Sequence, residues 1–370
     1  MKSQLLPMAA AASLAFTGWA TAQTSLKDAF KDHFLVGAAL NESQFNKRNP
    51  QQTALIKNEF NSISPENVMK WEEIHPAPDR FDFGPADRYV AFGETNGMFI
   101  IGHTLVWHSQ TPRWVFEGTN GQPADRATLL NTMSNHIFTV AGRYPGRVKG
   151  WDVVNEALNE DGTLRQSPWL KIIGEDYLVK AFEFAHAADP KAELYYNDYS
   201  LENPAKRAGA VALVKKLQAA GIHLTAIGTQ MHAKMDWPAP DLVEATLVEF
   251  GKLGIKVNIT ELDVDVLPAA NGNRGADVGM RAAQNPKLNP YPNGLPESGQ
   301  SALAKRYAEL FGVFVKHRSL VDRVTFWGVT DGDSWLNGWP IRGRTSYPLL
   351  FDRAGQPKPA FEAVLRTSGK

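Results

Sequence analysis

Short apolar runs alternate with longer amphipathic stretches along nearly the whole chain. Eight of the runs are rich in β-branched and aromatic residues and predict strands, and most are followed by a stretch with helical periodicity. We expect strands at residues 34–40, 62–66, 98–107, 148–156, 193–199, 224–232, 256–264 and 323–330. We expect helices at residues 52–60, 126–142, 170–188, 204–220, 241–253, 301–316 and 360–366. Eight strands joined by helices predict an α/β fold, the (β/α)8 TIM barrel.

The main alternative fold is a doubly wound open sheet, and the chain lacks the motif that favours it. No glycine-rich phosphate-binding turn follows the first predicted strand. No Pro-rich or Ser/Thr-rich linker divides the chain, so we expect a single domain. One irregular segment, residues 267–300, is rich in Asn, Gly and Pro and follows the seventh strand. This insertion either shapes one end of a cleft on the active-site face or is a bare surface excursion.

Residues 1–22 have the features of a secretory signal peptide. Lys2 gives a positive start, residues 5–19 are mostly apolar, and Ala20-Thr21-Ala22 fits the small-x-small cleavage pattern. The apolar stretch is shorter than the roughly 20 residues that span a membrane. We therefore expect residues 23–370 to form an exported domain, in the medium, at the cell surface or in the periplasm.

The charge balance excludes some partners. The chain has 39 basic and 39 acidic residues and no net charge, which argues against nucleic acid or an anionic membrane as a partner.

The chain has no cysteine, so an exported form depends on its core alone, as suits one large domain. We expect a monomer without a cofactor.

Two of the predicted strands end on a glutamate, the fourth on Glu156 and the seventh on Glu261. The carboxyl ends of barrel strands face the active site, and a pair of carboxyl groups about 5 Å apart is what a retaining glycosidase needs. Asn155 beside Glu156 can bind a sugar hydroxyl, which suits Glu156 to the role of acid. His232 can donate a hydrogen bond to Glu261 and be oriented by Asp263, which suits Glu261 to the role of nucleophile.

Two other kinds of catalytic site have little support. His103, His108 and His232 come from different strands and lack the HExxH spacing of a zinc site. No G-x-S-x-G turn follows a strand, so a nucleophilic serine is not indicated. We expect no metal.

The strand ends carry motifs that resemble the catalytic domain of glycoside hydrolase family 10, the endo-β-1,4-xylanases. The resemblance covers the chain from about Leu26 to the last helix. It lies in P-E-N-V-M-K-W (65–71), G-H-T-L-V-W-H-S-Q (102–110), W-D-V-V-N-E (151–156), T-Q-M-H (229–232), I-T-E-L-D (259–263) and the tryptophans 327 and 335. It implies a (β/α)8 barrel that hydrolyses internal β-1,4-xylosidic bonds of xylan by retaining double displacement.

The resemblance also implies roles for individual residues. Glu156 matches the acid/base, Glu261 the nucleophile, and Asn155 the residue that holds the 2-hydroxyl of the sugar in subsite −1. Residues around that same sugar are Lys70, His103, Gln230, His232 and Trp335. Contacts to the next sugar toward the non-reducing end are Glu66, Asn67 and Gln110. Trp107 matches the wall beside the reaction centre, Trp327 a lid over the glycone subsites, and Tyr199 a platform on the leaving-group side.

Three other activities stay open at the level of the sequence. They are a related retaining barrel acting on another β-1,4-glycan, a catalytically inactive sugar-binding barrel, and an exo-acting β-xylosidase or transglycosylase. Lys70, the glutamine and the lid tryptophan favour xylose, which lacks the C6 hydroxymethyl group. The preferred oligosaccharide length and the tolerance of arabinose or glucuronic acid branches are not indicated.

Overall fold

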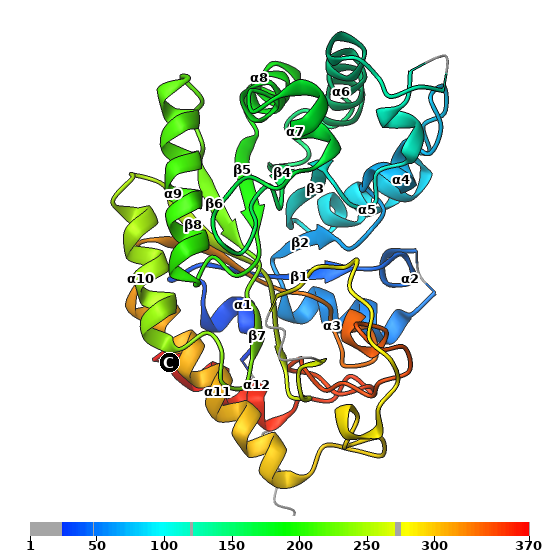
Figure 1. The fold of residues 1–370 in the computed structure, drawn as a ribbon. Coiled ribbons are helices and arrows are strands. Elements are labelled where there is room, and N and C mark those ends of the chain that lie inside the picture. The colour runs from blue at the N-terminus through cyan, green and yellow to red at the C-terminus, as the bar shows by residue number, and fades with distance from the viewer. Residues whose placement is uncertain (1–23, 47, 119–120, 271–274, 370) are drawn as a thin grey trace, which may run out of the picture.

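The computed structural model describes residues 24–46, 48–118, 121–270 and 275–369, and their centre is a closed barrel of eight parallel strands (Figure 1). Each strand pairs with its neighbour, β6 pairs with β8, and β9 pairs with β1 to close the ring. The predicted barrel is therefore confirmed, whereas the predicted signal peptide lies outside the described residues. The strands are β1 (Leu35–Leu40), β2 (Ser62–Pro65), β3 (Phe99–Trp107), β4 (Gly150–Asn155), β5 (Glu193–Asp198), β6 (Ala226–Thr229), β8 (Lys256–Asp265) and β9 (Val321–Phe326).

The sixth predicted strand is interrupted. It forms β6 and a short second piece, β7 (His232–Lys234), which also pairs with β8. The break occurs because Met231 has a φ of 61°, outside the region that a strand backbone adopts.

Helices follow most of the strands and surround the barrel (Figure 1). The predicted helix at 170–188 is in fact two helices, because Gly174 ends the first one with a φ of 94°. The helix from residue 84 was not among those predicted. The longer helices are α3 (Pro50–Glu59), α5 (Gly84–Thr95), α6 (Arg126–Ala141), α7 (Pro168–Ile173), α8 (Tyr177–Ala188), α9 (Pro204–Ala219), α10 (Pro240–Gly251), α11 (Glu297–Lys316) and α12 (Pro359–Thr367).

Short helical turns occupy the loops. They are α1 (Leu26–Ala29), α2 (Glu42–Phe45), α4 (Trp71–Ile74) and the 3-10 turns Arg113–Phe116, Pro286–Leu288 and Trp335–Asn337. Several helices begin with proline behind a capping side chain. In α9, for example, Asn203 accepts a hydrogen bond from the backbone N–H of Ala205. No helix among the described residues is long and apolar enough to cross a bilayer.

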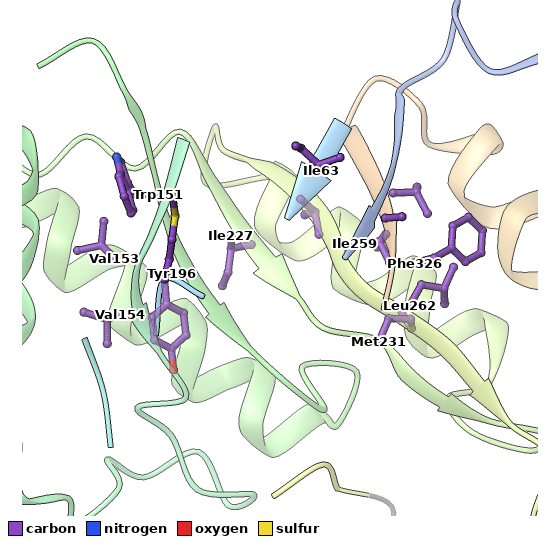
Figure 2. Packing of buried hydrophobic residues seen from close by; sticks show 14 of the residues in the cluster. Ile63, Trp151, Val153, Val154, Tyr196, Ile227, Met231, Ile259, Leu262 and Phe326 are labelled. Atoms are coloured by element: carbon purple, nitrogen blue, oxygen red, sulfur yellow. The ribbon is translucent and has the colours of Figure 1, made fainter. Parts of the chain in front are cut away.

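The main apolar core lies between the barrel and its helices. Side chains such as Ile63, Trp151, Ile227 and Ile259 are fully buried there (Figure 2). Alternate residues of each strand point the other way, into the barrel. A separate small cluster of Ile101, Tyr195 and Ala226 lies on that inner side, and the guanidinium of Arg323 from β9 lies 5.2 Å from the ring of Tyr195. Contact between β9 and β5, which are not neighbours, crosses the interior.

Candidate active site

Polar and aromatic side chains from several strand ends converge on one cavity at the carboxyl end of the barrel. Ten of the residues predicted from the sequence line it, together with Ala276 and Val278 of the insertion. The insertion thus reaches the site, in agreement with one of the two roles expected for it. The ten are Lys70, His103, Trp107, Asn155, Glu156, Gln230, His232, Glu261, Trp327 and Trp335.

Glu156 is buried and lies in the residue position just after β4. The indole N–H of Trp107 donates to its Oε2 at 2.9 Å, and the amide of Gln230 donates to its Oε1 at 3.0 Å. Burial, followed by the negative charge of Asp198, raises the pKa of Glu156 from 4.5 to about 7, and these two hydrogen bonds only partly oppose the rise. The carboxyl group is therefore protonated over much of the acidic range and can donate a proton.

Glu261 is equally buried, but its pKa is shifted in the opposite direction. Asn197 donates to its Oε1 at 2.9 Å, and Nε2 of His232 lies 3.2 Å from its Oε2. Burial alone would raise the pKa of Glu261, but the hydrogen bond from His232 and the charges of His103, His232 and Lys70 outweigh it and lower the pKa. Glu261 is consequently held as a carboxylate.

His232 links that carboxylate to a second one. Its Nδ1 lies 3.1 Å from Oδ1 of Asp263, whose Oδ2 accepts a hydrogen bond of 2.8 Å from the indole N–H of Trp335. Burial would lower the pKa of His232, but the charge and hydrogen bond of Asp263, with those of Glu261, raise it to about 10. The imidazolium is thus charged at neutral pH and donates to both acids, as the sequence led us to expect.

Three indoles and two histidines make the aromatic side of the cavity. Trp335 lies 4.8 Å from the ring of His232 and stacks on Trp339 at 4.4 Å. Trp327 meets His103 edge-on at 5.5 Å. Such ring faces offer the apolar contact area that a sugar ring requires.

Lys70 organises the side of the site next to β2 and β3. Its ammonium donates to Asn67 at 3.0 Å and to Gln110 at 2.8 Å. Asn67 and Gln110 do not line the cavity themselves and join it through this lysine. Burial lowers the pKa of Lys70, an effect that the charges of Glu261 and Glu66 oppose.

Three other predicted residues lie beside the cavity. Glu66 is half-buried, and burial raises its pKa against the opposing charge of Lys70. Asp263 acts on the site through His232 and Trp335. Tyr199 lines an adjoining small cavity that shares His232 and Ala276 with the first.

Sequence reasoning gave no role to two residues that support the site. Asn197 is fully buried, accepts from the hydroxyl of Thr260 at 2.6 Å and so directs its amide N–H to Glu261. Asp152 lies 2.9 Å from Nδ1 of His103. Both residues are polar positions on predicted strands, and this was the signal that could have found them. Ala276 and Val278 carry no such signal, because they are small apolar residues in an irregular segment.

No group of three or more potential metal-ligating side chains occurs within the ranges that the structure describes. The histidines instead bind carboxylates, as His103 and His232 do.

Cleaving a glycosidic bond with acid assistance requires two glutamates, one that keeps its proton and one that is ionised. On a (β/α)8 barrel, among amides and indoles, they define a glycoside hydrolase. Residues 25–367 match the model of Glycosyl hydrolase family 10, and the chain belongs to this family.

Curated relatives and solved structures agree with this assignment. The chain is 45% identical over 362 residues to "Endo-1,4-beta-xylanase A" of Xylanibacter ruminicola, covering 98% of this chain and 96% of the relative. It is 44% identical to "Beta-1,4-xylanase" of Dictyoglomus thermophilum, covering 92% and 90%. A GH10 endoxylanase retrieved from a sugarcane soil metagenome superimposes with a TM-score of 0.88 at 44% identity, covering 94% of this chain and all of that one.

Proposed function

We propose that this glycoside hydrolase is an endo-1,4-β-xylanase that cleaves internal β-1,4-xylosidic bonds of xylan with retention of configuration. The family match and the xylanase names of its relatives at 44–45% identity support the substrate. One solved relative at 34% identity is a mutant in complex with xylotriose, so a xylo-oligosaccharide can occupy this kind of barrel.

The observation that carries the mechanism is the asymmetry between the two glutamates. Glu156 has a raised pKa of about 7 and two hydrogen-bond donors, while the pKa of Glu261 is lowered by His232 and nearby cations. Glu156 thus acts as acid/base, and Glu261 acts as nucleophile.

The reaction proceeds by double displacement. Glu261 attacks the anomeric carbon while Glu156 protonates the departing glycosidic oxygen, and a glycosyl-enzyme ester forms. Glu156, now ionised, takes a proton from water, which attacks the same carbon and releases Glu261. The imidazolium of His232 neutralises Glu261 whenever the nucleophile is free.

The other predicted residues bind the substrate in this scheme. Asn155 holds the 2-hydroxyl of the sugar under attack, and Asp263 supports His232 and Trp335. The same sugar is surrounded by Lys70, His103, Gln230, His232 and Trp335. Glu66, Asn67 and Gln110 bind the next sugar toward the non-reducing end, Trp107 and Trp327 form the wall and lid, and Tyr199 lies on the leaving-group side.

Trp335 accounts for a preference for xylose over glucose in this proposal. Its indole is fixed on one edge by Asp263 and on one face by Trp339. In this proposal the fixed ring excludes the C6 hydroxymethyl group of a glucose unit, which xylose lacks.

The remaining expectations belong to the same proposal. The features of residues 1–22 support export to the medium, the cell surface or the periplasm, and the balanced charge argues against nucleic acid or an anionic membrane as a partner. A monomer without metal or cofactor is sufficient for the two-carboxylate chemistry.

A product profile tests the function. The purified enzyme should release mixed xylo-oligosaccharides from glucuronoxylan and should leave carboxymethylcellulose and mannan intact. Release of xylose alone would indicate an exo-acting enzyme, and the absence of any new reducing ends would indicate a sugar-binding barrel.

A further inference from the structure

The backbone at Glu156 is in an unfavourable conformation. Glu156 has a φ of 57°, in the left-handed region that residues with a Cβ rarely adopt. Such a conformation persists only where the surroundings hold it. One side of the turn is held by the Glu156 backbone N–H, which donates to the carbonyl of Asn197 at 2.9 Å.

Arg165 holds the other side of the turn. Its Nε donates to the backbone carbonyl of Glu156 at 3.1 Å, and a terminal nitrogen lies 3.4 Å from the carbonyl of Leu158. Its own backbone N–H donates to the carbonyl of Ala157 at 2.7 Å. Three consecutive carbonyl groups, those of residues 156–158, are therefore fixed by one arginine.

The same guanidinium reaches two elements on the leaving-group side. A terminal nitrogen donates to the hydroxyl of Tyr199 at 2.8 Å, and the other lies 3.7 Å from Oδ2 of Asp277 in the insertion. The Arg165 side chain is only 17% exposed. A planar guanidinium with five donors in fixed directions can make all these contacts at once, whereas a lysine cannot.

We propose that Arg165 is the positioning residue of the acid/base: it fixes the left-handed turn that aims the Glu156 carboxyl at the leaving-group oxygen. Arg165 does not touch the carboxyl group itself and acts through the backbone of Glu156. The inference rests on the proposed role of Glu156. The contacts of Arg165 with Tyr199 and Asp277 also hold the loop after β4 in place beside Tyr199 and the insertion.

The inference predicts which substrates are cleaved more slowly when Arg165 is replaced. A displacement of the acid by about 1 Å costs about 10²-fold in rate, but only where the leaving group needs a proton. Arg165→Met keeps most of the side-chain volume and removes every donor. Arg165→Lys keeps the charge and loses the fixed fork, so we expect it to behave much as Arg165→Met does.

The test measures kcat/KM, which reports the glycosylation step, for aryl xylobiosides from dinitrophenol to unsubstituted phenol as leaving group. For Arg165→Met we expect a roughly 10²-fold loss on the phenyl glycoside and on xylan, and a loss below about threefold on the dinitrophenyl glycoside. The dependence of log kcat/KM on leaving-group pKa should therefore become steeper. Equal losses on all leaving groups would overturn the proposal, because a merely structural role gives no such slope.

Two controls keep the result interpretable. Inactivation by a dinitrophenyl 2-fluoro-xylobioside needs no acid, so its rate should be unchanged in correctly folded Arg165→Met. Asp277→Asn removes one of the outer contacts of Arg165 and should not change the slope. If Asp277→Asn reproduces the slope, the positioning function belongs to that contact and the proposal is wrong. The aryl glycoside slope can be measured whether or not xylan is cleaved, so a failure of the proposed function is seen separately.

Discussion

Nε2 of His232 lies 3.2 Å from Oε2 of Glu261 while Nδ1 of the same ring faces Asp263. The hydrogen bond from this imidazolium is the largest of the effects that lower the pKa of Glu261. The nucleophile is thus prepared before substrate arrives, and the energetic cost of burying its charge is offset within the fold.

The first prediction concerns this nucleophile. Glu261→Ala should abolish turnover of both xylan and activated aryl xylobiosides, because the variant lacks the carboxylate that attacks the anomeric carbon. Trapping with a 2-fluoro-glycoside followed by peptide mass spectrometry should place the label on Glu261. Label on a different residue would contradict the assignment.

The second prediction separates the two glutamates by leaving group. Glu156→Ala should lower kcat/KM on xylan by about 10²–10⁴-fold, because general acid catalysis is lost. Cleavage of the first bond in dinitrophenyl xylobioside should be nearly unaffected, since that leaving group departs without a proton. A burst experiment measures this step, and equal losses on both substrates would count against Glu156 as the acid.

The third prediction is a bell-shaped pH profile for kcat/KM. The active form has Glu261 ionised and Glu156 protonated, so activity should fall on the acidic side as Glu261 protonates below 4.5 and on the basic side around pH 7. Asp198→Asn removes the second-largest contribution to the raised pKa of Glu156, so the basic limb should move to lower pH. The acidic limb should stay in place, and a basic limb unmoved in this variant would contradict the electrostatic account.

The fourth prediction concerns stability. Glu156 has a pKa of about 7 in the folded protein against 4.5 for an exposed glutamate, so the folded state binds this proton more tightly. The free energy of unfolding therefore decreases as the pH rises from 4.5 through 7, by up to about 3 kcal/mol. The side chain of Glu156→Gln cannot ionise. The amide of Gln230 can rotate so that its oxygen accepts a hydrogen bond from the new amide.

This variant should unfold at a higher temperature than the wild type at pH 8 and at nearly the same temperature at pH 4. Calorimetry at both pH values checks it, with Glu175→Gln as an exposed control that should show no such difference. A variant less stable than the wild type at pH 8 would show that the hydrogen bonds of Glu156 outweigh the cost of its burial.

The sequence predicts the barrel well because each parallel strand is buried on both faces and reads as a separate apolar run. It predicts the position of the glutamates for a related reason, because the end of such a run marks the carboxyl end of a strand, where the active site of a barrel lies. Where the chain departs from the repeat, prediction fails. Nothing in the sequence Thr229-Gln230-Met231-His232 indicates a left-handed backbone at Met231, and Gly174 inside an amphipathic stretch was compatible with one continuous helix.

Contacts that depend on long-range geometry were the hardest to foresee. Arg165 lies in a polar loop, and its sequence context is that of an exposed arginine. Only the fold brings its guanidinium within hydrogen-bond distance of the Glu156 carbonyl and the Tyr199 hydroxyl. Ala276 reaches the cavity from an insertion whose path follows no periodic pattern. Only the closed barrel brings these segments together.

The fifth prediction concerns the contact between Gly228 and Asn197 beneath the nucleophile. A Cβ on Gly228 of β6 would lie 2.3 Å from Oδ1 of Asn197, the residue that donates to Glu261. Gly228→Ala should therefore displace Asn197 and lower kcat by about 10- to 100-fold. Gly312→Ala, in a helix where the added methyl meets nothing within 4 Å, is the matched control and should leave kcat unchanged.

The crowding at Gly228 has a consequence for the history of such an enzyme. Because one methyl group at Gly228 would lie too close to the residue that supports the nucleophile, we expect this position to tolerate almost no substitution during evolution. New substrate preferences must instead arise by exchange of rim segments such as the insertion, which can be lengthened, shortened or replaced while the chemistry below is inherited intact.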